Sequence, residues 1–332
     1  MHLNAYPAAL QQNANWNLIG NPYNASYDIK GLKAAGITAP IHIWNGTGYT
    51  TYDPEYDDYT LQPFEAFFVQ TSGTETQSIY LSPEYIVGSN GGGNGSYEMI
   101  EGELSGAFSI SESIQVHFSK GNLQYQASTN TWRFAESQYA YIGEENTTNI
   151  SEPTNGGWID LFGWGTGDNP TRSSQNGSQY SEFSDWGINA ILNGGNIANA
   201  WQTLKSDEWA YLLQSRANAQ QLQGVATVNG YTGLILLPDN WFDNGHTSLV
   251  DSYTSGEWET MESAGAVFLP AAGYRWGSSK MYEVGVSGEY WSASFSTTDE
   301  AYDLDFKSGN INPMNTFSRE YGFSVRLVRQ IQ

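Results

Sequence analysis

Three features that the sequence lacks narrow the range of functions. No cysteine occurs among its 332 residues, which excludes disulfides, thiolate metal sites and cysteine nucleophiles. Lys and Arg number only 13 against 35 Asp and Glu, and the resulting net charge of −22 would repel phosphate backbones and anionic bilayers. No apolar run reaches the length of about 18 residues that a membrane-spanning helix needs. We therefore expect no nucleic-acid partner and no insertion of this chain into a membrane.

Aromatic residues, in contrast, make up 14% of the chain, so it can bury a core and fold. A chain of this length favours two domains. The stretch 88–96 (GSNGGGNGS) contains no apolar residue and predicts a flexible linker between a domain at residues 1–87 and a second at residues 97–332. No basic-then-apolar leader is present, so we expect any export signal to lie outside this chain.

The first domain is predicted to be rich in strands. Apolar or alternating runs indicate strands at residues 16–20, 41–44, 49–52, 64–69 and 78–81. Asn45-Gly46 is a hairpin turn pair, because both residue types accept positive φ. A short helix is predicted over residues 28–35, ending at Gly36.

The second domain mixes short strands with two predicted helices. Ser206 and Ser255 are the expected N-caps of these helices, each followed by acidic residues that favour the positive end of the helix dipole. Strands are predicted at residues 115–118, 234–237, 266–269, 290–292 and 323–328. Strands and helices do not alternate regularly, so the pattern favours an α+β fold over a doubly wound parallel sheet.

No motif indicates a metal, a cofactor or a nucleophilic catalyst, and we expect none of them. The histidines are far apart and none belongs to an HExxH motif: His2, His42, His117 and His246. The glycine-rich residues 163–167 lack the strand-to-helix context of a phosphate loop. The acidic residues 53–58 lack the glycine and the final glutamate of an EF-hand, which favours a solvated loop over a calcium site. Most of the tryptophans are expected in the core.

The segment from Ala301 to Lys307 shows the clearest pattern in the sequence. Its residues alternate, with Tyr302, Leu304 and Phe306 on one side and Asp303, Asp305 and Lys307 on the other. A period of two indicates a half-buried strand whose polar side chains face water. The polar residues 309–315 then form a turn-rich connection to the last strand. This segment predicts a binding surface on a rigid support.

Several landmarks occur in order across the second domain, namely residues 118–125 (FSKGNLQY), 158–165 (WIDLFGWG), 204–209 (LKSDEW), 236–239 (LLPD), 268–275 (FLPAAGYR), 290–292 (YWS) and 322–326 (GFSVR). With them, residues 110–329 resemble the C-type-lectin-like domains of secreted Bacteroidetes proteins, which share the broad fold of the formylglycine-generating enzymes. Residues 301–312 (AYDLDFKSGNIN) resemble the variable region of retroelement-diversified ligand-binding proteins. Residues 13–87, with WNLIGNP at 16–22 and PFEAFFV at 63–69, resemble a β-sandwich module that often precedes such domains.

The resemblance implies a ligand-facing set on the surface formed by residues 291–321. Its variable-region pattern assigns Glu300, Asp303, Asp305, Lys307, Asn310, Asn312, Asn315, Phe317 and Glu320 to the ligand. The predicted surface also includes Trp291, Phe295 and Tyr321. The resemblance thus implies a non-catalytic, secreted or surface-displayed protein that binds a protein or a glycan.

Departures from these families limit the activities to expect. Formylglycine generation needs cysteines, which this chain lacks. The Glu-Pro-Asn and Trp-Asn-Asp motifs of calcium-dependent lectins are also missing, because Asn312-Pro313 and Asp239-Asn240-Trp241 have the wrong order. Two other functions stay open: a carbohydrate-active enzyme that uses paired carboxylates, and a structural component of a fimbria or surface layer.

Overall fold

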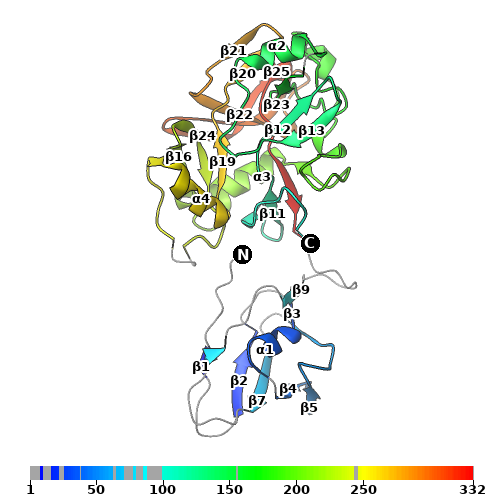
Figure 1. Cartoon of the computed structure of the whole chain (residues 1–332), viewed down its shortest axis with the longest axis vertical. Coiled ribbons are helices and arrows are strands. Elements are labelled where there is room, and N and C mark those ends of the chain that lie inside the picture. Colours follow the sequence, from blue (N-terminus) through cyan, green and yellow to red (C-terminus); the bar gives the residue numbers. More distant parts are fainter. Residues whose placement is uncertain are drawn as a thin grey trace. The chain divides into compact units, whose positions relative to one another are not determined.

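The chain divides into two compact units, residues 1–98 together with residue 332, and residues 99–331. The computed structural model describes residues 8–9, 16–21, 26–37, 39–62, 65–70, 78–79, 85–87, 99–154, 156–242 and 246–331. The predicted linker at residues 88–96 lies outside these ranges. Strands predominate in both units and helices are few (Figure 1), so the fold is mixed α+β. None of the helices in the described ranges is long and apolar enough to cross a membrane.

The smaller unit is built on antiparallel sheets. Its four-stranded sheet has the order β2 (Trp16–Gly20), β7 (Ala66–Gln70), β4 (Ile41–Trp44) and β5 (Tyr49–Tyr52). A second sheet has the order β6 (Thr60–Leu61), β3 (Ser26–Asp28) and β9 (Ile86–Val87), and β1 (Ala8–Ala9) pairs with β8 (Ser78–Ile79). The single α-helix described in this unit is α1 (Lys30–Ala34). Apolar side chains from these elements, including Tyr27, Leu32, Ile41 and Phe67, form one core.

The β4–β5 hairpin and the acidic loop after it differ in detail from the sequence prediction. The hairpin of β4 and β5 is confirmed, with a loop that spans residues 45–48. Gly46 has a positive φ of 96°, whereas Asn45 does not have a positive φ. The acidic loop at residues 53–58 contacts α1, because Asp58 pairs with Lys30 and Glu55 pairs with Lys33. These acidic side chains therefore have lysine partners.

The described residues of the larger unit form five small sheets. Two of them have four strands, in the orders β10 (Phe108–Ser109), β11 (Gln115–Phe118), β26 (Leu327–Gln330), β15 (Gln202–Thr203), and β18 (Ser252–Tyr253), β16 (Gln223–Val228), β17 (Tyr231–Leu236), β19 (Val267–Pro270). Two three-stranded sheets have the orders β13 (Thr131–Phe134), β12 (Leu123–Gln126), β14 (Trp158–Ile159), and β21 (Lys280–Tyr282), β20 (Tyr274–Trp276), β25 (Tyr321–Gly322). The third three-stranded sheet has the order β22 (Ser287–Phe295), β23 (Glu300–Lys307), β24 (Asn310–Ser318). Every pairing is antiparallel except that of β16 with β18.

Helices differ from the prediction in number and in their first residues. A third α-helix, α2 (Glu145–Ser151), was not predicted, because its sequence ENTTNIS carries almost no apolar periodicity. The N-cap of α3 (Ser206–Ala210) is Lys205, and Glu208 accepts a hydrogen bond from its backbone N–H. The N-cap of α4 (Ser255–Ser263) is Thr254, whose hydroxyl accepts from the Glu257 N–H. Both observed caps thus lie one residue before the predicted serines.

Short helical turns complete the larger unit: η2 (Gly177–Tyr180), η3 (Trp186–Ile188), η4 (Tyr211–Ser215) and η5 (Ala219–Gln221). Of these, η4 is a π-helical turn that directly continues α3. Helix α3 packs against β22, β23 and β24 near the middle of the unit (Figure 1). The tryptophan prediction is largely confirmed, because Trp132, Trp164, Trp201, Trp209, Trp241, Trp258 and Trp291 are buried.

The β22–β24 sheet is anchored by its inner face. Tyr290, Leu304 and Phe306 are fully buried in the main core, where Ile311 packs against them. Leu304 and Phe306 thus occupy the core positions that the sequence predicts. Gly288 lies directly opposite Phe306, and a Cβ placed on Gly288 would overlap the Phe306 ring. The close approach of β22 to β23 therefore depends on this glycine.

We predict that Gly288→Ala destabilises the larger unit, because the Phe306 ring is enclosed by the core and has to shift. Overpacking of this kind costs about 1–3 kcal/mol. The measurement is denaturant unfolding of the full chain followed by tryptophan fluorescence. The control is Gly256→Ala in the first turn of α4, where a Cβ meets nothing within 4 Å. Equal stability of the two variants would contradict the packing argument.

Candidate ligand-binding surface

The antiparallel register of β22, β23 and β24 places most of the predicted site residues on one side of a single sheet. Asp305 lies between Glu289 on β22 and Asn312 on β24, and Asp303 lies between Trp291 and Asn315. Because side chains alternate along each strand, these residues point away from the face that carries Leu304 and Phe306. We call this side the hairpin face; it comprises Glu289, Trp291, Asp303, Asp305, Lys307, Asn310, Asn312, Asn315 and Phe317.

The part of the hairpin face nearest the β23–β24 turn is open to solvent. Lys307 and Asn310 are exposed, and Asp305 and Asn312 are partly exposed. The side chains of Asp305, Lys307 and Asn310 make no hydrogen bond to any residue that the structure describes. This group therefore offers a carboxylate, an ammonium and an amide whose hydrogen-bonding capacity is available to a ligand.

Two residues predicted to face the ligand are buried instead. Asp303 has no exposed surface, and both of its carboxylate oxygens accept hydrogen bonds from Asn315 Nδ2 at 3.2 Å. Trp291 stacks on Phe323 at 4.2 Å between ring centroids, and its indole N–H donates to the Phe162 carbonyl. The predictions that Asp303 faces water and that Trp291 faces the ligand are therefore wrong, because other parts of the chain cover this end of the sheet.

Burial also changes the acid–base properties of this face. It raises the pKa of Glu289 to about 8, and the nearby carboxylates of Asp305, Asp303 and Glu283 raise it further in the same direction. Burial likewise raises the pKa of Asp303 to about 7. The pKa of Asp305 is raised by burial, an effect that Lys307 opposes. Glu289 Oε1 accepts a hydrogen bond from the Ser287 hydroxyl, whereas its buried Oε2 has no partner among the described residues.

Aromatic rings border the polar residues. Tyr321 contacts Phe317 and Trp276, with centroid distances of 4.6 Å and 4.4 Å, and Tyr274 stacks on Tyr282 at 5.3 Å. We call these five partly exposed residues the ring cluster. Burial raises the pKa of Tyr274, and the carboxylates of Glu283 and Glu289 raise it in the same direction. Tyr274 also contacts Phe317 of the hairpin face, with 5.9 Å between ring centroids, so the ring cluster borders that face.

Three other predicted residues lie away from the hairpin face. Phe295 is 67% exposed and lines a separate groove of about 800 Å³ together with Tyr302. Glu300 begins β23 on the side that carries Leu304, and Glu320 follows β24 with its carboxylate near Gly177. The structure therefore does not bring these three residues together with Asp305.

Sequence reasoning missed several residues of this surface. Glu289 is the single acidic residue in a run of apolar or small residues, and this isolation is the one sequence feature that could have indicated a site residue there. The ring cluster residues Tyr274, Trp276 and Tyr282 come from β20 and β21, and no local pattern links them to β23. Their proximity depends on the pairing of β20 with β25, which is a long-range contact.

The arrangement suits recognition better than metal binding. Within the described ranges, no group of three or more His, Asp and Glu residues is placed to hold a metal ion. Comparison with family models, curated proteins and solved structures found no match. The inference about function thus depends on the geometry of this surface and on the resemblances in the sequence.

The pKa of Glu289 predicts how stability depends on pH. The folded state keeps the proton up to about pH 8, whereas the unfolded chain releases it near the ordinary value of 4.5. Unfolding between these pH values therefore releases a proton, so the free energy of unfolding falls as pH rises, by up to about 1.4 kcal/mol per pH unit for this group.

We expect Glu289→Gln to lose less stability than the wild type between pH 5 and pH 8, measured by denaturant unfolding at both values. The control is Glu259→Gln at an exposed position on α4, which should keep the wild-type dependence. The same pH profile in wild type and Glu289→Gln would show that Glu289 does not hold its proton in the folded state.

Proposed function

We propose that this protein is a non-catalytic ligand-binding protein, secreted or displayed at a cell surface, whose hairpin face recognises a protein or a glycan. In this proposal residues 99–331 form a C-type-lectin-like domain of the kind that the sequence landmarks resemble. The smaller unit is a β-sandwich-like spacer, and retroelement-type diversification would act on the exposed residues of β23 and β24. No nucleic acid or membrane lipid is expected as partner, because the net charge is −22.

One observation carries the proposal. The side chains of Asp305, Lys307 and Asn310 make no hydrogen bond to the described residues, and they stand on the paired strands β23 and β24, which Leu304 and Phe306 anchor in the core. A polar side chain that is held by a rigid strand loses little conformational freedom when it binds, so its hydrogen bonds contribute more to affinity.

The ring cluster adds the second half of a recognition surface. Tyr and Trp are the residue types enriched at binding interfaces, because a rigid ring supplies contact area at a low cost in entropy. Tyr282 is 38% exposed, and Phe317 and Tyr321 are partly exposed beside the polar residues. A ligand can therefore contact the rings and the hydrogen-bonding groups at the same time.

We predict that the double variant Asp305→Asn/Asn312→Ala loses binding without losing stability. Both residues are partly exposed, and the change turns the Asp305 carboxylate into a neutral amide and removes the hydrogen-bonding side chain of Asn312. The measurement applies labelled full-length protein to an array of glycans and to an array of purified secreted proteins. A signal from the wild type should fall at least tenfold in the variant.

The control is Asp251→Asn/Gln221→Ala, which makes a similar chemical change at two exposed positions outside the hairpin face. Its signals should equal those of the wild type. Undiminished binding by Asp305→Asn/Asn312→Ala, or no wild-type signal on either array, would refute the hairpin face as a recognition surface.

The neighbouring carboxylates favour a carbohydrate-active enzyme as the second candidate function. Glu289 holds its proton to about pH 8, beside Asp305 on the next strand, and a protonated and an ionised carboxyl group are the pair that glycoside hydrolysis needs. The burial of Glu289 and Asp303 opposes this function, because a general acid has to reach the substrate oxygen.

An assay for the release of reducing sugar distinguishes a binding protein from an enzyme. We expect the wild type to release no reducing sugar from a panel of polysaccharides and oligosaccharides over the pH range 4–8. Turnover by the wild type that falls at least a hundredfold in Glu289→Gln, while binding persists, would instead identify an enzyme.

A further inference from the structure

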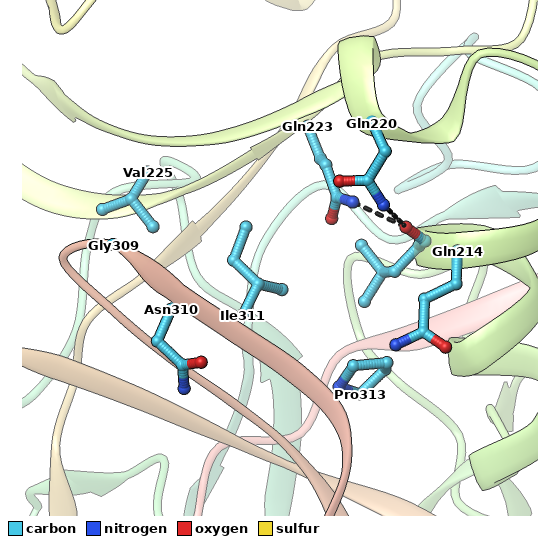
Figure 2. A pocket seen from close by; sticks show the side chains of 9 residues that line it. Gln214, Gln220, Gln223, Val225, Gly309, Asn310, Ile311 and Pro313 are labelled. Carbon is cyan, nitrogen blue, oxygen red and sulfur yellow. Dashed lines mark hydrogen bonds between the residues drawn. The ribbon is translucent and has the colours of Figure 1, made fainter.

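A concave site separate from the hairpin face lies beside the β23–β24 turn, on the side of the hairpin away from Asp305. It is a cleft of about 420 Å³ between η4, the start of β16 and the start of β24 (Figure 2). Ile311 shows which side of the hairpin this is, because its cross-strand partner is the core residue Phe306. All nine lining residues are uncharged: Leu213, Gln214, Gln220, Gln223, Val225, Gly309, Asn310, Ile311 and Pro313.

A carbonyl near the end of η4 organises the polar groups of this cleft. Leu213 lies in the last turn of the helical segment, which ends at Ser215, and carbonyls of a last turn have no intrahelical donor. The Leu213 carbonyl instead accepts hydrogen bonds from Gln223 Nε2 at 2.6 Å and from Gln220 Nε2 at 3.5 Å. Because a carbonyl can only accept, both glutamine side chains have to turn their NH₂ groups toward it.

This orientation directs the other atom of the Gln223 amide into the cleft. Figure 2 shows Gln223 Oε1 pointing to the space beside Ile311, away from the hydrogen bond to Leu213. The oxygen is buried and has no hydrogen-bond partner among the described residues. A buried acceptor without a donor costs about 1–3 kcal/mol, so a ligand that donates a hydrogen bond to Gln223 Oε1 recovers part of this cost.

Gln214 and Asn310 extend the polar lining toward solvent. Both residues are exposed, and the structure gives their side-chain amides no hydrogen bond within the described ranges. An amide donates through nitrogen and accepts through oxygen, which matches a hydroxyl group that does both. Val225, Ile311 and Pro313 supply apolar surface between these amides.

The lining excludes several other kinds of ligand. An anion would find no cationic side chain in the cleft, and the net charge of −22 would repel it. A cation would find no carboxylate in the lining. A peptide that added a strand to the β24 edge would lose a ladder hydrogen bond at Pro313, which has no N–H. An uncharged ligand with several hydroxyl groups on a compact apolar ring fits both the amides and the volume.

We propose that this cleft binds an uncharged sugar, with Gln223 Oε1 accepting from a hydroxyl group and with Gln214 and Asn310 bonding others. This site is separate from the recognition surface of the proposed function, because the acids and rings of the hairpin face do not line it. The two sites meet at Asn310, so a ligand in the cleft would extend around the tip of the hairpin.

The test is saturation-transfer NMR and calorimetry on the full chain with glucose, galactose, mannose, xylose, N-acetylglucosamine and glucuronic acid as probes. At least one uncharged sugar should bind, with an affinity that 0.5 M NaCl leaves unchanged, and glucuronic acid should bind more weakly. Gln223→Met, which keeps the side-chain length and removes the acceptor, should weaken binding at least fivefold.

Gln220→Met is the matched control, because it removes the other hydrogen bond to the Leu213 carbonyl and leaves Gln223 Oε1 in place. It should change the affinity less than twofold. Gln214→Trp is a second test that does not depend on how Gln223→Met affects folding. Gln214 is exposed, so the added ring fills the cleft without disturbing the core, and it should abolish binding.

Binding in the cleft should persist in Asp305→Asn/Asn312→Ala, which separates failure of this site from failure of the hairpin face. The proposal is overturned if no uncharged sugar binds, if Gln223→Met and Gln214→Trp bind like the wild type, if glucuronic acid binds best, or if an extended dipeptide amide competes for the same site.

Discussion

The burial of Leu304 and Phe306 in the main core fixes the orientation of the whole β22–β24 sheet. A register slip of one residue would turn every side chain of β23 to the other face, which would put the partly exposed Asp305 and the exposed Lys307 into the core. The cost of burying those charges excludes that register. The polar residues of β23 are thus held in position by their apolar neighbours, and the available groups of Asp305 and Lys307 are a direct result of that packing.

Much of this sheet could be predicted from the sequence, because its signal is local. Alternation along residues 301–307 correctly assigns Leu304 and Phe306 to the core, and the strand-like character of residues 290–292 is confirmed within β22. The burial of Asp303 and Trp291 could not be predicted in the same way. It depends on Phe323 and Phe162, and Phe162 lies 129 residues from Trp291 along the chain. Periodicity indicates which side of a strand a residue occupies and says nothing of what covers that side.

Helical features show a similar division between local and long-range information. Thr254 and Lys205 cap their helices one residue before the predicted serines. Thr254 and Ser255 are both favourable N-cap types, so type alone does not rank them, whereas at Lys205 the Glu208 carboxylate caps the backbone and no preferred N-cap side chain marks the position. The π turn of η4 has no mark in the sequence YLLQS that distinguishes it from a regular helical turn. The Leu213 carbonyl near the end of this turn orients two glutamines, and no residue pattern indicates that contact either.

Strand β26 gives the larger unit a particular order of assembly. Its residues, Leu327–Gln330, pair with β11 on one side and with β15 on the other, so a strand made later than both of its partners fills the middle of a four-stranded sheet. While the chain emerges from a ribosome, β11 and β15 stay as open edges until β26 has been translated. Such edges attract strands from other molecules. A chain that stops before Leu327 would therefore be prone to aggregation, even though it contains all of the surface residues discussed above.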